Sequence, residues 1–189
     1  MKKKTRITIL LTTLLLLFAF AMPASAASTK TKALKAYRNF LEKEKDNLFY
    51  QYFGIAYINN DSVPELVAYG LGGKPTICYY KNGKVKKLWS AANCYYSHYY
   101  KKKGVVKQTA YRPEEWDYYG YVKVNLAKNK CSILSGYSDG KYEKYENSKY
   151  KTISKKQFNN ILKKAVGKTK PTKIKYYKNT AANRKKYLK

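Results

Sequence analysis

The chain has 189 residues and carries 40 Lys and Arg against 11 Asp and Glu, which gives a formal net charge of +29. This length suits one ordinary domain and is short for two. Three Cys are too few for a disulfide scaffold, and the sequence contains neither a His and Cys metal cluster nor a G-x-S-x-G or P-loop pattern. Composition therefore excludes several familiar enzyme classes and favours binding to anionic partners.

The first 26 residues contain the three parts of a secretory signal peptide. Basic residues lie between Lys2 and Arg6, an apolar run spans 7–21, and Ala24-Ser25-Ala26 has the small side chains that signal peptidase requires. The apolar run is shorter than the roughly 18 residues of a membrane-spanning helix. We therefore expect cleavage after Ala26 and a secreted, extracellular protein without an integral membrane segment, which its positive charge could hold non-covalently at the cell wall.

The rest of the chain predicts an α+β fold. A helix is expected over 30–45, where Ala33, Tyr37 and Leu41 repeat at helical spacing. From Tyr50 to Ile153 the sequence changes to short runs rich in Tyr, Val and Ile. The turn signals between these runs are Asn59-Asn60-Asp61, Gly72-Gly73, Asn82-Gly83, Lys103-Gly104 and Asp139-Gly140. We expect an antiparallel β-meander, as a curved sheet or partial barrel, packed by an N-terminal and a C-terminal helix.

Three local patterns give the sharpest structural predictions. Asn82-Gly83 favours a type I′ hairpin turn, because both residues tolerate positive φ. Alternation over Tyr118 to Ala127 predicts a strand with one core face and one solvent face. Ser154 and Gln157 form a capping box for a helix that ends at Gly167.

We expect three segments in the chain: a signal peptide over 1–26, a single α+β domain over 27–167 and a basic flexible tail over 168–189. The last segment holds nine basic residues, no acidic ones and few large aliphatic side chains. Such a composition predicts mobility and salt-sensitive affinity for polyanions. Cys78, Cys94 and Cys131 can form at most one internal disulfide, and three buried thiols are an equal alternative.

Residues 57–66 read YINNDSVPEL, which resembles the D-x-N-x-D-G-x-P-E-L segment of many uncharacterised secreted Gram-positive proteins. The same pattern is similar to the calcium loops of integrin-type β-propeller repeats. The resemblance implies a calcium site with ligands from Asn59, Asp61 and Glu65. Tyr57 stands where the pattern has its first Asp, and Ser62 stands where it has Gly. The alternative is a tight polar turn without a metal, so calcium is the only cofactor that we consider.

The sequence offers few candidates for catalysis. Glu114, Glu115 and Asp117 flank Trp116, and two carboxylates near an aromatic residue, here Glu114 and Glu115, are what a hydrolase of wall or glycan material would need. An acidic patch paired with nearby Lys is the structural alternative. Cys131 could meet His98 across the sheet as a thiolate and base, although an ordinary strand histidine is the simpler interpretation.

The composition points most directly to a binding module. Lys101, Lys102 and Lys103 would attract an anionic cell-surface or extracellular polymer, and tyrosines would add flat contact surface. The candidate tyrosines are Tyr95, Tyr99 and Tyr118. The alternatives are that half of each Tyr pair faces the core and that the Lys residues serve solubility. We do not expect nucleic acid as the partner, because export removes the usual target and no familiar binding motif is present.

Overall fold

The computed structural model describes residues 29–71, 75–89, 94–110, 117–147 and 149–189. The predicted signal peptide and its cleavage site at Ala26 lie outside these residues. A helix covers 29–43. The further elements are η1 (Leu48–Tyr50), β1 (Tyr52–Ala56), β2 (Glu65–Tyr69), β3 (Thr76–Lys81), β4 (Lys84–Trp89), β5 (Cys94–Tyr100), β6 (Val105–Ala110), β7 (Tyr118–Asn125), β8 (Lys130–Ser138), β9 (Lys141–Glu146), β10 (Lys149–Ile153), α2 (Lys155–Val166), β11 (Pro171–Lys173), β12 (Tyr177–Lys178) and α3 (Ala181–Tyr187).

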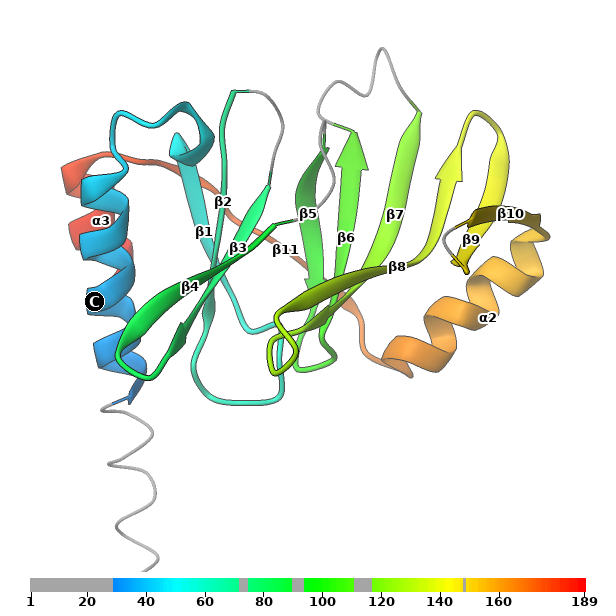
Figure 1. Ribbon diagram of the computed structural model, residues 1–189, viewed down its shortest axis with the longest axis horizontal. Coiled ribbons are helices and arrows are strands. Elements are labelled where there is room, and N and C mark those ends of the chain that lie inside the picture. The colour runs from blue at the N-terminus through cyan, green and yellow to red at the C-terminus, as the bar shows by residue number, and fades with distance from the viewer. Residues whose placement is uncertain (1–28, 72–74, 90–93, 111–116, 148) are drawn as a thin grey trace, which may run out of the picture.

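The strands form two antiparallel sheets, which confirms the predicted α+β class. One sheet has the order β12-β1-β2-β3-β4 and the other has the order β10-β9-β8-β7-β6-β5-β11. The sheets do not close into a barrel. Figure 1 shows the N-terminal helix and α3 at one end of the molecule and α2 at the other end.

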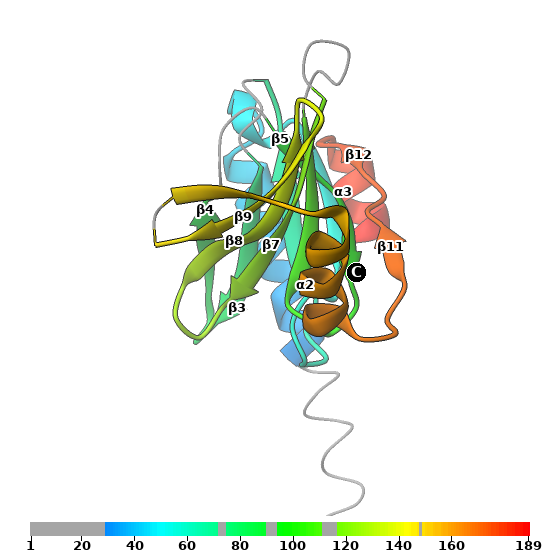
Figure 2. The ribbon, with the colours of Figure 1, turned by 90° about the vertical axis from the view of Figure 1, so that its right-hand side faces the viewer.

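Three apolar clusters hold these layers together. One joins residues of both sheets, such as Val67 and Val106, and so forms a shared core. A second packs the N-terminal helix and α3 on the five-stranded sheet, and a third packs α2 on the seven-stranded sheet. Figure 2 shows α2 lying across the seven-stranded sheet. No helix among the described residues is long and apolar enough to cross a membrane.

The local sequence signals form the structures that they predicted. Asn82 and Gly83 have φ angles of 52° and 78°, as the type I′ turn between β3 and β4 requires. The Ser154 hydroxyl accepts a hydrogen bond from the Gln157 amide, and the Gln157 side chain accepts one from the Ser154 amide. Gly167 ends α2 with a φ of 61°. These signals work because each turn or cap is decided within a few residues.

The alternating strand over 118–127 differs from its prediction on one face. The face with Tyr119, Tyr121 and Lys123 was expected to be solvated along its length. In the structure Tyr121 is buried, because Phe158 of α2 packs on it with ring centroids 5.7 Å apart. Only the end of this face, with Lys123 and Asn125, is exposed.

The prediction of a flexible tail over 168–189 is wrong, because this segment is part of the fold. β11 pairs with β5 and β12 pairs with β1, so the segment joins the edges of both sheets. Between them Ile174 is only 3% exposed and belongs to the shared core. Gly54 permits this close passage, since a Cβ there would lie 2.6 Å from the Lys175 carbonyl oxygen.

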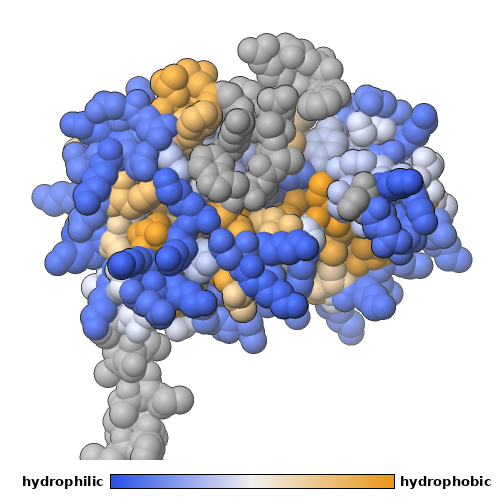
Figure 3. Space-filling view, in the orientation of Figure 1, coloured by the Kyte–Doolittle hydropathy of each residue, from blue (hydrophilic) through white to orange (hydrophobic). Residues whose placement is uncertain are grey.

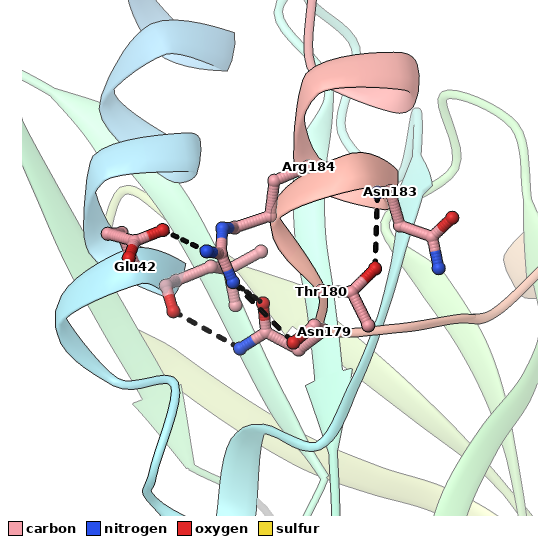
Figure 4. A network of polar contacts seen from close by, with 6 residues as sticks. Glu42, Asn179, Thr180, Asn183 and Arg184 are labelled. Carbon is pink, nitrogen blue, oxygen red and sulfur yellow. Dashed lines mark hydrogen bonds and ion pairs between the residues drawn. The ribbon is translucent and has the colours of Figure 1, made fainter.

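A buried arginine fixes the end of this segment. Arg184 on α3 is 4% exposed and forms an ion pair with Glu42 of the N-terminal helix. Its guanidinium also donates to Asn179 Oδ1 over 2.9 Å, and Asn179 Nδ2 donates to the Leu41 carbonyl over 3.1 Å (Figure 4). Composition did not predict that 168–189 would be ordered. A few apolar and polar side chains are enough to hold the segment when they pack against a core that other elements form.

Candidate functional site

Two loops that the sequence analysis singled out lie against each other. The loop over 57–65, whose last residue Glu65 begins β2, connects β1 to β2, and the turn over 101–104 connects β5 to β6. The Lys102 amide donates to the Tyr57 carbonyl over 2.9 Å, and the Gly104 amide donates to the Ile58 carbonyl over 2.7 Å. These backbone hydrogen bonds place the predicted lysine turn beside the predicted calcium loop.

A cleft of about 420 Å³ opens between these loops and the end of β7. We call it the lysine cleft. Among the described residues that line it, three side chains are cationic, three are amides and none is acidic. The lining residues are Asn59, Asn60, Lys102, Lys103, Gly104, Lys123, Val124, Asn125, Leu126 and Ala127. Cationic and amide donors without a competing carboxylate are what an oxyanion ligand requires.

The backbone of the turn holds the lysines in place. Lys102 adopts a positive φ of 60°, and the amide of Lys103 donates to the Tyr100 carbonyl over 3.0 Å. Lys123 Nζ donates to the Lys103 carbonyl over 2.7 Å. All three ammonium groups are exposed, and the ion pairs of the described residues involve none of them.

The neighbouring loop over 57–65 uses its polar side chains internally. Asp61 Oδ1 accepts from the Val63 amide over 2.8 Å, and its Oδ2 accepts from Asn59 Nδ2 over 2.7 Å. Asn59 Oδ1 accepts from the Asp61 amide over 3.1 Å. This network of short-range hydrogen bonds is that of a tight Asx-type turn.

Glu65 is a buried carboxyl group at the end of the same loop. It is 1% exposed, and its Oε2 accepts from the Ile58 amide over 2.8 Å. Burial raises the pKa of Glu65 from 4.5 to about 8, against the opposing effect of the Ile58 hydrogen bond. The group is therefore largely protonated at neutral pH and does not weaken the positive potential of the lysine cleft.

Calcium binding by Asn59, Asp61 and Glu65 stays a prediction. The three residues line one cleft of about 300 Å³ together with Tyr37 and Tyr79. Both Asp61 oxygens accept hydrogen bonds within the loop, and Glu65 is neutral near pH 7, whereas Ca²⁺ affinity depends on ligand charge. No group of three or more His, Cys, Asp and Glu side chains is placed to hold a metal within the described ranges.

The three candidate tyrosines do not join the lysine cleft. Tyr99 is 8% exposed and lies in the shared core, so its role as an exposed contact was wrongly predicted. Tyr118 is half-buried and accepts a hydrogen bond from Gln108. Tyr95 packs on Tyr69, with ring centroids 5.9 Å apart. Of the predicted binding residues, Lys102 and Lys103 line the lysine cleft. Lys101 is not among the lining residues, and its Nζ lies 6.0 Å from the Tyr57 ring centroid.

The described residues do not bring catalytic groups together. β6 and β7 separate His98 on β5 from Cys131 on β8. Burial raises the pKa of the Cys131 thiol to about 11, which favours the unreactive thiol. Cys78, Cys94 and Cys131 are all free. Glu114 and Glu115, the candidates for a hydrolase, lie outside the described residues.

Asn60, Lys123 and Asn125 were missed as members of the site. The predicted alternation of β7 did place Lys123 and Asn125 on a solvent face, which was the available signal. Only the packing of β7 beside the 101–104 turn puts them in one cleft.

No family model, no curated protein and no solved structure matches this chain.

Proposed function

We propose that this protein is a secreted, strongly cationic binding module that engages an anionic cell-surface or extracellular polymer through the lysine cleft. The observation that carries the proposal is the cleft lining, in which Lys102, Lys103 and Lys123 lie with three Asn side chains and no acidic side chain is among the described lining residues. Phosphate and carboxylate groups fit such a lining, because each ammonium donates charge-assisted hydrogen bonds.

The distribution of the acidic side chains supports this proposal. Several of the 11 acidic residues are paired with nearby cations, such as Glu44 with Lys87 and Glu146 with Lys144. Glu65 and Asp61 are used inside their loop. The 40 basic residues therefore greatly outnumber the acids that could neutralise them, and hydrophilic residues cover much of the face in Figure 3. A field of this sign attracts polyanions to the surface.

The proposal is tested by retention of the mature chain on beads that carry poly(glycerol phosphate), across a salt series. Lys102→Asn with Lys103→Gln removes two cleft charges, and Asn tolerates the positive φ of position 102. We expect about tenfold weaker retention, which corresponds to about 1.4 kcal/mol. Retention of the unmodified protein should fall as salt rises.

Two controls make the assignment specific. Lys155→Gln with Lys156→Gln removes the same number of charges from exposed positions in the first turn of α2 and should retain most of the binding. Neutral dextran beads should retain none of the proteins. Equal loss in both double variants would contradict the cleft assignment, and negligible retention of the unmodified protein would contradict polymer binding.

Secretion is tested separately by expressing the full chain in a bacterial host and analysing the culture medium by mass spectrometry. We expect a product that begins at Ala27, because Ala24-Ser25-Ala26 supplies the cleavage site. Recovery of the full-length chain from the cell fraction alone would contradict this prediction.

A further inference from the structure

Three basic side chains lie in a row across neighbouring strands, away from the lysine cleft. His98 on β5 is the register partner of Lys107 on β6 and of Lys173 on β11. Residues that pair directly across antiparallel strands project from the same face of the sheet. We call Lys107, His98 and Lys173 the histidine row.

The histidine row has no acidic partner among the described residues. The ion pairs formed between described residues involve neither Lys107 nor Lys173. Lys107 Nζ lies 4.5 Å from the ring centroid of Tyr119, a contact that leaves its charge in place. Lys107 and Lys173 flank His98 from the strands on either side of β5, so their charges disfavour a proton on its ring, and an anion bound between them would offset this effect.

The histidine itself has an unusual environment. Its Nδ1 is buried and has no hydrogen-bond partner in the described structure. Burial, then Lys107 on β6, then Lys173 on β11 hold the pKa of His98 below its usual value. Among the described residues no other charged group contributes to this shift, and with its pKa below the usual value the ring is neutral at neutral pH.

We propose that the histidine row is a second oxyanion site, which takes one phosphate or carboxylate group between Lys107 and Lys173 and takes up a proton on His98 as it binds. The proposal draws its ligand class from the proposed function, but it needs only a single oxyanion and no polymer. The bound anion favours the imidazolium form, so binding and protonation strengthen each other. Affinity for the anion therefore increases as the pH falls through the pKa of His98.

The test is an NMR titration of the His98 ring in the mature protein. The chain has a single His, so its ring signals need no further assignment. We expect the pKa of His98 to be about 0.5 higher in inorganic phosphate than in chloride at equal ionic strength. Identical titration curves in the two salts would overturn the proposal.

Matched variants locate the anion. Lys107→Met and Lys173→Gln should each raise the pKa of His98 in chloride, because a nearby cation is removed, and should each at least halve the further rise that phosphate causes. Lys155→Gln with Lys156→Gln should keep the full rise. A rise that persists undiminished in both row variants would place the anion elsewhere and overturn the proposal. Dispersed tyrosine ring signals in the same spectra show that each variant is folded.

Two further experiments distinguish phosphate from carboxylate as the ligand, and binding at the histidine row from binding at the lysine cleft. Poly(glycerol phosphate) carries its negative charges on phosphate groups, and polyglutamate carries them on carboxylate groups. The polymer that causes the larger rise in the pKa of His98 identifies the group that the site prefers. Lys102→Asn with Lys103→Gln should keep the rise in phosphate while it loses bead retention. If the unmodified protein is not retained on beads but phosphate raises the pKa of His98, the proposed function fails and the histidine row stands.

Discussion

The loop over 57–65 and the turn over 101–104 lie side by side and use their charged residues in opposite ways. Both acidic side chains of the loop, Asp61 and Glu65, accept hydrogen bonds from backbone amides of their own loop. In the turn, backbone hydrogen bonds hold the chain, and the side chains of Lys102 and Lys103 remain exposed. In these two loops the acidic side chains hold the backbone through hydrogen bonds, while the cationic side chains are exposed to solvent.

This difference follows from the composition. A chain with 11 acids and 40 bases cannot pair most of its bases. Buried carboxylates are favourable only when hydrogen-bonded, whereas Lys keeps its ammonium in water at little cost. The comparison predicts that changes in the loop affect stability and that changes in the turn affect binding.

The largest effect should come from Glu65→Ala. The substitution removes the acceptor of the Ile58 amide and leaves a cavity at a position that is 1% exposed. We expect a loss of about 2–4 kcal/mol in the free energy of unfolding, measured by urea denaturation. Glu65→Gln keeps the acceptor and the volume and is the control. A loss below about 1 kcal/mol in the Ala variant would contradict the structural role of this carboxyl group.

The pH dependence of stability should be an effect of similar size. The pKa of Glu65 is raised to about 8 in the folded protein, so between pH 4.5 and 8 the folded state retains a proton that the unfolded state has lost. The contribution of Glu65 therefore makes stability fall as the pH rises through this window, by up to about 1.4 kcal/mol per pH unit. Glu65→Gln should remove this slope, and denaturation curves at several pH values compare the two proteins. Identical slopes would show that Glu65 ionises normally.

Asp61→Ala should have a smaller effect with two components. Loss of the acceptor for the Val63 amide should cost about 1 kcal/mol. Loss of a negative charge beside the lysine cleft should slightly strengthen retention on poly(glycerol phosphate) beads. Asp61→Asn keeps an acceptor but not the charge, so it should show the gain in retention with a smaller loss in the free energy of unfolding. Weaker retention in both variants would mean that Asp61 takes part in binding.

The smallest effect on stability should come from Lys102→Asn with Lys103→Gln. These exposed side chains make no ion pair among the described residues, so urea denaturation should show a change within about 0.5 kcal/mol. The same variant loses retention in the bead experiment. A large loss of stability would contradict the prediction that changes in the turn affect binding and not stability.

Much of the architecture could be read from local patterns. Asn82-Gly83 and Ser154 with Gln157 each decide a turn or a cap within a few residues, and both predictions are confirmed. The candidate site was harder to predict. Lys102 and Lys103 were singled out, but Asn60 and Lys123 were not, because they join the cleft only through the packing of β1, β5 and β7.

By itself, the sequence determined the α+β class, the hairpin turns, the two amphipathic helices and the excess of positive charge, because these depend on periodicity, turn chemistry and composition. Tertiary structure alone decided that 168–189 joins both sheets, that Tyr99 and Tyr121 are buried, and that Lys173 lies beside His98. Such outcomes depend on contacts between residues far apart in the chain. A segment with few apolar side chains can pack stably when those side chains enter a core that other parts of the chain form. Local sequence does not show which distant residues form that core.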